Sequence, residues 1–146
     1  MKTVGILLLM LAASSANAQD IERNNPPGMT QPTSYSHLVS FDRIMFIAGQ
    51  VAVDGAGNIV GEGDMAAQMR QVLENLKTVL ASRGADFSDI VKINIFTTDI
   101  DAFRQTASIR AEYFGDHAPA STLVQIEQLA RPVFLLEIEA IAIAPD

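Results

Sequence analysis

The segment LLEIEAIAIA, residues 135–144, alternates its side chains with the two-residue period of a β-strand. The even-numbered positions are all apolar, which predicts a face buried against a core. The odd-numbered positions carry two glutamates, Glu137 and Glu139, among three apolar residues. A sheet with apolar residues on both faces needs cover on both. The segment therefore predicts a sheet with helices on one face and a partner, most simply a second copy of the chain, on the other.

Two helices are expected to cover the first face. Apolar residues recur at helical spacing across residues 64–83, with Asp64 in the N-cap position and Gly84 as the stop. A second helix is expected from residue 99 or 100 to residue 114, ended by Gly115. Two helices of this length cover one face of a sheet and leave the other free.

The remaining elements are predicted to be strands. They are residues 35–41, residues 44–48 with a continuation over 50–53, residues 90–96 and residues 121–126. Residues 42–43 form the first turn, and residues 54–58, DGAGN, form a hairpin connection because Gly and Asn accept positive φ. In the 90–96 strand, Val91 is expected to share a face with Ile93 and Ile95. Strands and helices mix along the chain, so the fold class is α+β, a mixed sheet with two helices packed on one face.

Composition limits the chemistry and the partners. The chain has 146 residues and a net charge of −7, and such an acidic surface repels phosphate backbones, so no nucleic-acid partner is expected. It has no Cys, which excludes disulfides, thiolate metal sites and cysteine nucleophiles. It has two His, which argues against a multi-histidine metal site. We expect neither a metal nor an organic cofactor.

The N-terminus reads as an export signal. Residues 1–18, MKTVGILLLMLAASSANA, combine a basic start, ten apolar residues and a small-residue cleavage site before Gln19. The alternative is a membrane anchor, but ten residues rising 1.5 Å each cover about half of a ~30 Å hydrocarbon core. A periplasmic or secreted protein is predicted, with no stable membrane association after cleavage. Residues 19–34 are expected to be an extended lead-in, and residues 35–146 the folded domain.

Several motifs have simpler explanations than a functional site. The glycines of residues 55–61 have the wrong spacing for a dinucleotide loop, and a turn explains them. The acidic residues of 54–64 lack the spacing of a calcium loop. No G-x-S-x-G is present for a serine hydrolase. The isolated His37 and His117 are interpreted as structural.

Glu137 and Glu139 remain the most informative polar pair. Both lie on the same face of the last strand, beside interface-like apolar residues. One interpretation is a solvated or ion-paired strand face. The other is a carboxylate in a cleft between subunits, acting as a base or orienting a water molecule. The residues alone leave both open.

Four motifs together resemble the reactive intermediate deaminase family, also called Rid or YjgF. They are Ala48-Gly49-Gln50, AAQMRQVLENL at residues 66–76, DIVK at residues 89–92 and EIEAIA at residues 137–142. The resemblance covers about Tyr35 to Pro145. It implies a chorismate-mutase-like α+β fold and a homotrimer with small-molecule clefts between subunits. It also implies cofactor-free hydrolysis of enamines and imines to 2-oxo acids and ammonia.

The resemblance also assigns site residues. Glu137 corresponds to the family's last-strand glutamate that helps to place water, and Tyr35 to its cleft tyrosine. Ala48 and Gly49 correspond to the strand end beside the substrate, although active deaminases more often have Ser at the first of these positions. These four residues are the retained part of the predicted site, with Glu137 as its catalytic residue.

The chain departs from the pattern on the strand of residues 121–126. By the same resemblance Ser121, Thr122 and Leu123 are expected to bind the substrate. Ser121 stands where active deaminases have the Arg that binds the substrate carboxylate, and Leu123 where a Cys is often found. Ala107 stands where Asn is frequent. A bidentate Arg–carboxylate pair is charge-assisted, and a hydroxyl does not replace it. Arg131 is one residue that would compensate if it reached the cleft.

Two hypotheses follow for the function. The first is an exported imine or enamine hydrolase with a changed substrate, for example one that lacks a carboxylate. The second is a trimer that has lost deamination and binds a small neutral metabolite or a protein in the periplasm. A ribonuclease activity, attached to some members of the family, is disfavoured by the acidic charge and the export signal.

Overall fold

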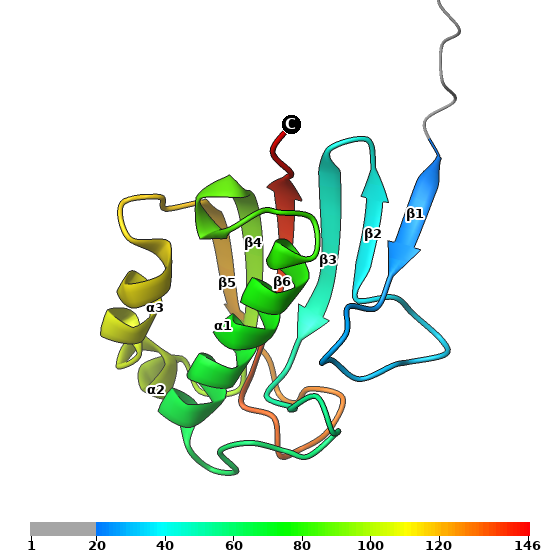
Figure 1. The fold of residues 1–146 in the computed structure, drawn as a ribbon. Helices are drawn as coiled ribbons and strands as arrows, with labels where there is room; N and C mark the ends of the chain where they lie inside the picture. The colour runs from blue at the N-terminus through cyan, green and yellow to red at the C-terminus, as the bar shows by residue number, and fades with distance from the viewer. Residues whose placement is uncertain (1–19) are drawn as a thin grey trace, which may run out of the picture.

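A computed structural model describes residues 20–146; the predicted signal of residues 1–18 lies outside them. The six strands form one sheet in the order β1-β2-β3-β6-β4-β5 (Figure 1). Their bounds are β1 Ile21–Asn24, β2 Leu38–Phe41, β3 Ile44–Gln50, β4 Ile90–Thr97, β5 Ala120–Gln125 and β6 Leu136–Ile143. Only β4 and β5 pair in parallel. The α+β fold with a mixed sheet is confirmed.

The helices all lie on one face of the sheet (Figure 1). They are α1 Met65–Ala81, α2 Ile100–Arg104 and α3 Ala107–Phe114, with a short 3₁₀ helix, η1, at Phe87–Asp89. The prediction of two helices was wrong in number because the second one is broken after Arg104. Buried Thr106 donates its hydroxyl to the Phe103 carbonyl over 2.7 Å. Such a local bond competes with the helical backbone pattern and favours a break here.

The N-cap of α1 is confirmed. The Asp64 carboxylate accepts a hydrogen bond from the Ala67 backbone N–H over 3.0 Å, at an extended backbone conformation. Gly84 follows the helix with φ of +69°, a conformation that glycine adopts without strain. The apolar stripe of α1 is fully buried against the sheet at Met69, Val72, Leu73, Leu76, Val79 and Leu80.

Removal of this N-cap should lower the free energy of unfolding by the amount that a helix N-cap typically contributes. Asp64→Ala removes the acceptor and is expected to lower the free energy of unfolding by about 1 kcal/mol, measured from urea unfolding. Asp64→Asn keeps a capping side chain and should cost less than half of that. Equal losses for the two variants would contradict a capping role.

The last strand has the two faces that its alternation predicts. Leu136, Ile138, Ala140, Ala142 and the following Ala144 are buried beneath the helices. Its position in the sheet is central, because β6 pairs antiparallel with both β3 and β4. The strand that dominated the sequence pattern therefore joins the two halves of the sheet.

Val91 differs from the expectation. Ile93 and Ile95 are buried, but Val91 is 48% exposed. The register with β6 is irregular between Ile90 and Lys92, and this irregularity breaks the strict alternation of faces. The two-residue period therefore begins at Lys92.

Two other boundaries differ as well. The lead-in contains β1, which pairs antiparallel with β2, so residues 21–24 are an edge strand of the sheet. Strand β3 ends at Gln50, and the expected continuation is reduced to a single bridge between Val53 and Ile59. The turn of residues 54–58 is present between them, closed by the Asp54 carboxylate.

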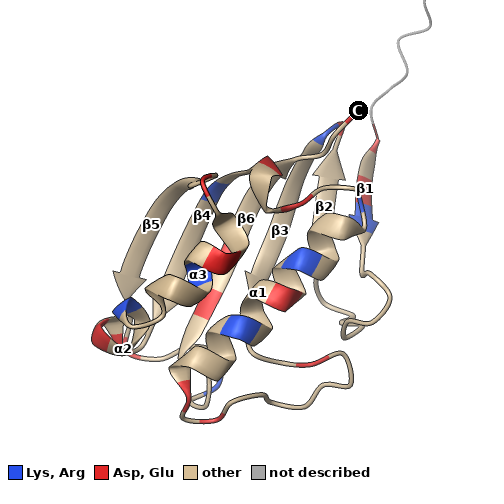
Figure 2. Cartoon of the chain, turned by 60° about the vertical axis from the view of Figure 1, so that its left-hand side comes forward, with Lys and Arg blue, Asp and Glu red and all other residues tan. Residues whose placement is uncertain are grey.

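The face of the sheet away from the helices is uncovered and apolar. Its exposed large residues include Ile21, Phe41, Ile44, Phe46 and Val124. Charged residues gather on the helices and loops, and the strands carry few of them (Figure 2). We refer to this surface as the open face. No helix within residues 20–146 is both long and apolar enough to cross a bilayer.

Candidate functional site

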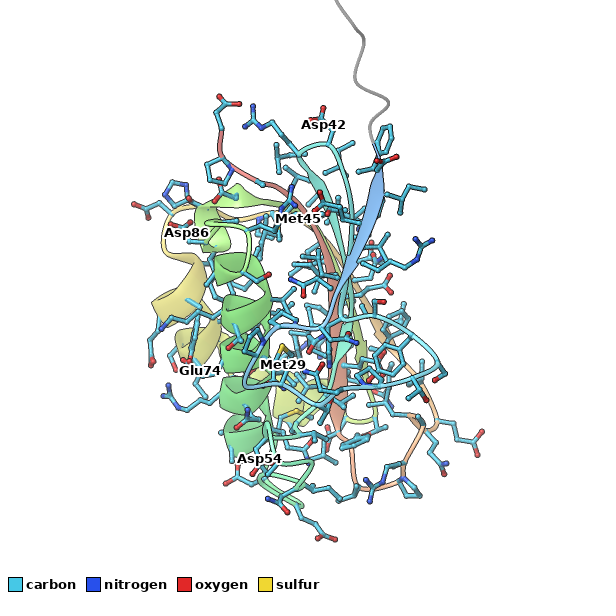
Figure 3. All side chains as sticks on the ribbon, turned by 45° about the vertical axis from the view of Figure 1, so that its right-hand side comes forward. Met29, Asp42, Met45, Asp54, Glu74 and Asp86 are labelled. Atoms are coloured by element: carbon cyan, nitrogen blue, oxygen red, sulfur yellow. The ribbon has the colours of Figure 1, made fainter. Side chains whose placement is uncertain are left out.

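A cavity of about 550 Å³ lies at the end of β3 where several loops meet. Its walls come from the loop after β1, the residues before β2, the loop after β3, helix α1 and the start of β6. Two of the lining residues, Met29 and Asp54, come from different loops and lie beside the lower half of α1 in Figure 3. The other lining residues include Thr30, Tyr35, His37, Ala48, Gly49, Gln50, Asn75, Ala130, Phe134 and Glu137.

Four predicted site residues meet in this cavity: Tyr35, Ala48, Gly49 and Glu137. The other three, Ser121, Thr122 and Leu123, lie on β5 at the far edge of the sheet, and β6 and β4 separate them from β3. One copy of the chain therefore assembles only the retained part of the predicted site.

The β5 residues also differ in direction. Ser121 is opposite buried Ile93 in the parallel register, so it shares the helix-covered side, and Leu123 packs against the core there. Thr122 lies on the open face, where its hydroxyl accepts a hydrogen bond from Lys92 Nζ over 2.6 Å. Ser121 itself is exposed at the sheet edge.

A bulge in β3 shapes the cavity wall. The register with β6 passes from Ile47 opposite Ala140 to Gln50 opposite Ile138, so Ala48 and Gly49 together face one residue. A Cβ atom added to Gly49 would collide with the Glu137 carboxylate and lie 2.6 Å from its Cδ. Glycine is therefore required at residue 49 for Glu137 to occupy its position.

Glu137 is partly buried, and no described Lys, Arg or His forms an ion pair with it. Burial, and then the neighbouring charge of Glu139, raise the pKa of the Glu137 carboxyl. Glu139 is different, because Asn94 donates a hydrogen bond to it over 2.7 Å. Of the two interpretations of this pair, the structure favours an uncompensated carboxylate at a cavity for Glu137 and a hydrogen-bonded strand face for Glu139.

A buried polar network formed by Gln50, His37 and Thr30 stabilises the bulge. The Gln50 amide donates to the Ala48 carbonyl over 2.8 Å and to His37 Nδ1 over 3.3 Å. His37 Nε2 then donates to the Thr30 carbonyl over 3.1 Å, which assigns the neutral tautomer with hydrogen on Nε2. Burial lowers the pKa of His37, outweighing its hydrogen bonds.

Asn75 holds the part of the cavity wall that follows β3, at Val51 and Val53. Its amide donates to the carbonyls of Val51 and Val53 over 3.0 and 2.9 Å, and Gln71 donates to its side-chain oxygen. Sequence reasoning did not assign a role to Gln50 or Asn75, although both lie in motifs that carried the resemblance. Their roles depend on loops distant in sequence, so the spacing of residues gave no signal for them.

The network makes stability depend on pH. Because the folded pKa of His37 is lowered, the unfolded chain binds its proton more readily, and His37 should reduce stability as pH falls from about 6.5. His37→Gln should weaken this dependence in urea unfolding at pH 7.5 and pH 5.5. His117→Gln, at an exposed site, serves as the control and should leave the dependence unchanged. An unaltered slope in His37→Gln would contradict the assignment of a buried neutral imidazole.

No Lys or Arg lines the cavity in the part of the chain that the structure describes. Arg131 lies outside it, with its guanidinium 5.5 Å from the centre of the Phe134 ring, and borders a separate hollow beside Glu62. Within one chain, therefore, Arg131 does not supply the cation that Ser121 lacks. Residues 20–146 also contain no cluster of three or more His, Cys, Asp or Glu that would hold a metal ion.

The fold and cavity define a class: small α+β proteins with a helix-covered mixed sheet, an open apolar face and a cavity built around a strand bulge and a glutamate. Residues 28–144 match the family described as Endoribonuclease L-PSP. The chain belongs to this family, which includes the Rid and YjgF proteins.

Particular relatives are similar over most of their length. A RutC family protein of Pyrococcus horikoshii is 38% identical over 108 residues, covering 74% of this chain and 85% of the relative. The human 2-iminobutanoate/2-iminopropanoate deaminase is 32% identical over 130 residues, covering 89% and 93%. A crystal structure of the Rid family protein YyfA from Yersinia pestis superposes with a TM-score of 0.73 at 34% identity, covering 80% and 92%.

Proposed function

We propose that this protein hydrolyses the C=N bond of small imines, or of enamines through their imine form, and that its substrates lack a carboxylate. The observation that carries the proposal is Glu137, a partly buried carboxylate with a raised pKa and no described cation beside it, facing a cavity of about 550 Å³. The name of the human relative, an iminobutanoate deaminase, supports the reaction class. Because residue 121 is Ser and not Arg, the chain lacks the cation that would pair with a substrate carboxylate, so we propose substrates without one.

The reaction requires one group that moves a proton in both directions. Glu137 accepts a proton from water while the water oxygen bonds to the carbon of the protonated imine, which gives a neutral carbinolamine. The protonated Glu137 then returns this proton to nitrogen and, as a carboxylate again, takes the hydroxyl proton while the C=O bond forms and the C–N bond breaks. A carbonyl product leaves, and the departing ammonia or amine carries the last proton away from Glu137. A raised pKa suits this exchange because it brings the carboxyl closer to the working pH.

A second copy of the chain is part of the proposal. On the open face, Phe46 is 48% exposed and Ile44 is 37% exposed. An apolar surface of this kind is usually covered by a partner. We infer a homotrimer in which β5 of one copy approaches the cavity of the next, as the resemblance implies. The predicted signal of residues 1–18 supports action in the periplasm or outside the cell.

The test uses two matched classes of imine. An amino-acid oxidase generates 2-imino acids in place, and an amine oxidase generates imines without a carboxylate; their decay is followed with and without protein. We expect faster decay of the second class and little or no effect on the first. Ser121→Arg should raise the activity on 2-imino acids if β5 of a neighbouring copy borders the cavity. Failure to accelerate either class would overturn the hydrolase proposal.

The alternative is a non-catalytic binder of a small neutral metabolite or of a protein. It is favoured by Ser121, because a family member without the substrate-binding Arg has lost a charge-assisted contact. It predicts that wild type and Ser121→Arg are both inert toward imines. The same assay therefore distinguishes the two functions.

A further inference from the structure

Among the residues that the structure describes, every side-chain amide and imidazole N–H that lines the cavity is already used inside the protein. Both hydrogens of the Gln50 amide are directed at Ala48 and His37. Both hydrogens of the Asn75 amide are directed at the carbonyls of Val51 and Val53. His37 donates to Thr30. An anionic ligand would therefore find neither a cation nor a spare side-chain amide in this wall.

The negative groups of the cavity are not equally available. Asp54 also lines it, but its two oxygens accept hydrogen bonds from the backbone of Ala56 and from Asn58. Those bonds close the turn and hold the pKa of Asp54 below its usual value. Among residues 20–146, no such hydrogen bond reaches the Glu137 carboxylate. It is the carboxylate that is free to pair with a ligand.

The remaining surface suits an organic cation. Tyr35, which is 52% exposed, contributes an aromatic face to the same cavity, and Phe134 and Met29 contribute apolar walls. A cation is attracted to an aromatic face and to a carboxylate held out of bulk water. Even partial burial of a carboxylate without a partner is unfavourable, so a ligand cation beside Glu137 would be stabilised.

We infer that this cavity selects positively charged, carboxylate-free amines and iminium ions, with Glu137 as their counter-ion. As a substrate class, the inference rests on the proposed function: the C=N group would be bound in its protonated form, which is also the form that water attacks most readily. The preference for binding cations does not depend on whether the protein is an enzyme. The geometry is the juxtaposition of one unpaired carboxylate, an aromatic ring and side-chain amide and imidazole donors that are all engaged.

The test compares three probes of one shape that differ in charge: benzylamine, benzyl alcohol and benzoate. Their binding to the full mature protein is measured by calorimetry and by chemical-shift changes at constant ionic strength. Benzylamine is expected to bind at least tenfold more tightly than either of the others. Benzoate or benzyl alcohol binding as tightly as benzylamine would overturn the inference, and this comparison needs no variant.

Two variants locate the interaction. Glu137→Gln should remove the preference for benzylamine, and Glu139→Gln, on the same strand face but hydrogen-bonded to Asn94 in a different hollow, should retain it. A preference that persists in Glu137→Gln would place the cation elsewhere and contradict the inference.

The hydrolase proposal and the cation inference fail in different ways. Benzylamine binding without imine hydrolysis would leave the cation site standing and reject the enzyme. Imine hydrolysis inhibited by benzyl alcohol as strongly as by benzylamine would retain the enzyme and reject the charge selection.

Discussion

Glu137→Gln is expected to lower kcat/KM for imine hydrolysis by about 10²–10⁴-fold, because the amide cannot take the proton of the attacking water. The substitution keeps the size of the side chain and removes the repulsion from Glu139, so the fold should not lose stability. The measurement is the rate of imine decay with the amine-oxidase system, beside urea unfolding of the same samples.

Glu139→Gln is the matched control for this variant. It changes the neighbouring carboxylate on the same strand face, which accepts its hydrogen bond from Asn94 and borders a different hollow. It should alter the rate by less than threefold. A Glu137→Gln protein that retains wild-type turnover would remove Glu137 from the chemistry.

Gly49→Ala is expected to have the second largest effect, although it adds a single methyl group. The new Cβ would occupy the space of the Glu137 carboxylate, and the flexible glutamate would swing aside while the backbone stays in place. Displacing a reacting group by about 1 Å costs on the order of 10²-fold in rate. We expect a folded protein with a rate reduced by about this factor.

A double-mutant cycle separates this positioning effect from general damage. In a Glu137→Ala background the carboxylate is gone, so Gly49→Ala should cost little further activity. Additive losses for the two changes would mean that Gly49 acts independently of Glu137. The split between kcat and KM adds a second readout, because a misplaced base should lower kcat more than it raises KM.

Much of the fold was predictable because its signals are local. The alternation of residues 135–144 and the apolar stripe of α1 with Asp64 at its cap were both confirmed. What failed depends on interactions that a linear pattern does not contain. Thr106 breaks a helix through a hydrogen bond to Phe103, and Val91 leaves its expected face at an irregular register with β6. Strand β1 exists through its pairing with β2.

The candidate site was predictable in part. Family resemblance pointed to Tyr35, Ala48, Gly49 and Glu137, and the structure brings these four residues to one cavity. Their roles in binding and catalysis stay predictions, as do those of Ser121, Thr122 and Leu123. The polar wall behind Gly49 was not foreseen, because His37 and Gln50 meet Thr30 only through the packing of a loop.

The order of strands has a consequence for biosynthesis. Along the chain, the central strand β6 follows every other strand of the sheet, and β3 and β4 are joined only through it. Until β6 has been synthesised, the segments that form β1-β2-β3 and β4-β5 have no strand between them. The sheet therefore cannot close before β6 has left the ribosome. A chain that postpones folding in this way stays suited to threading across a membrane, the route that its first 18 residues predict.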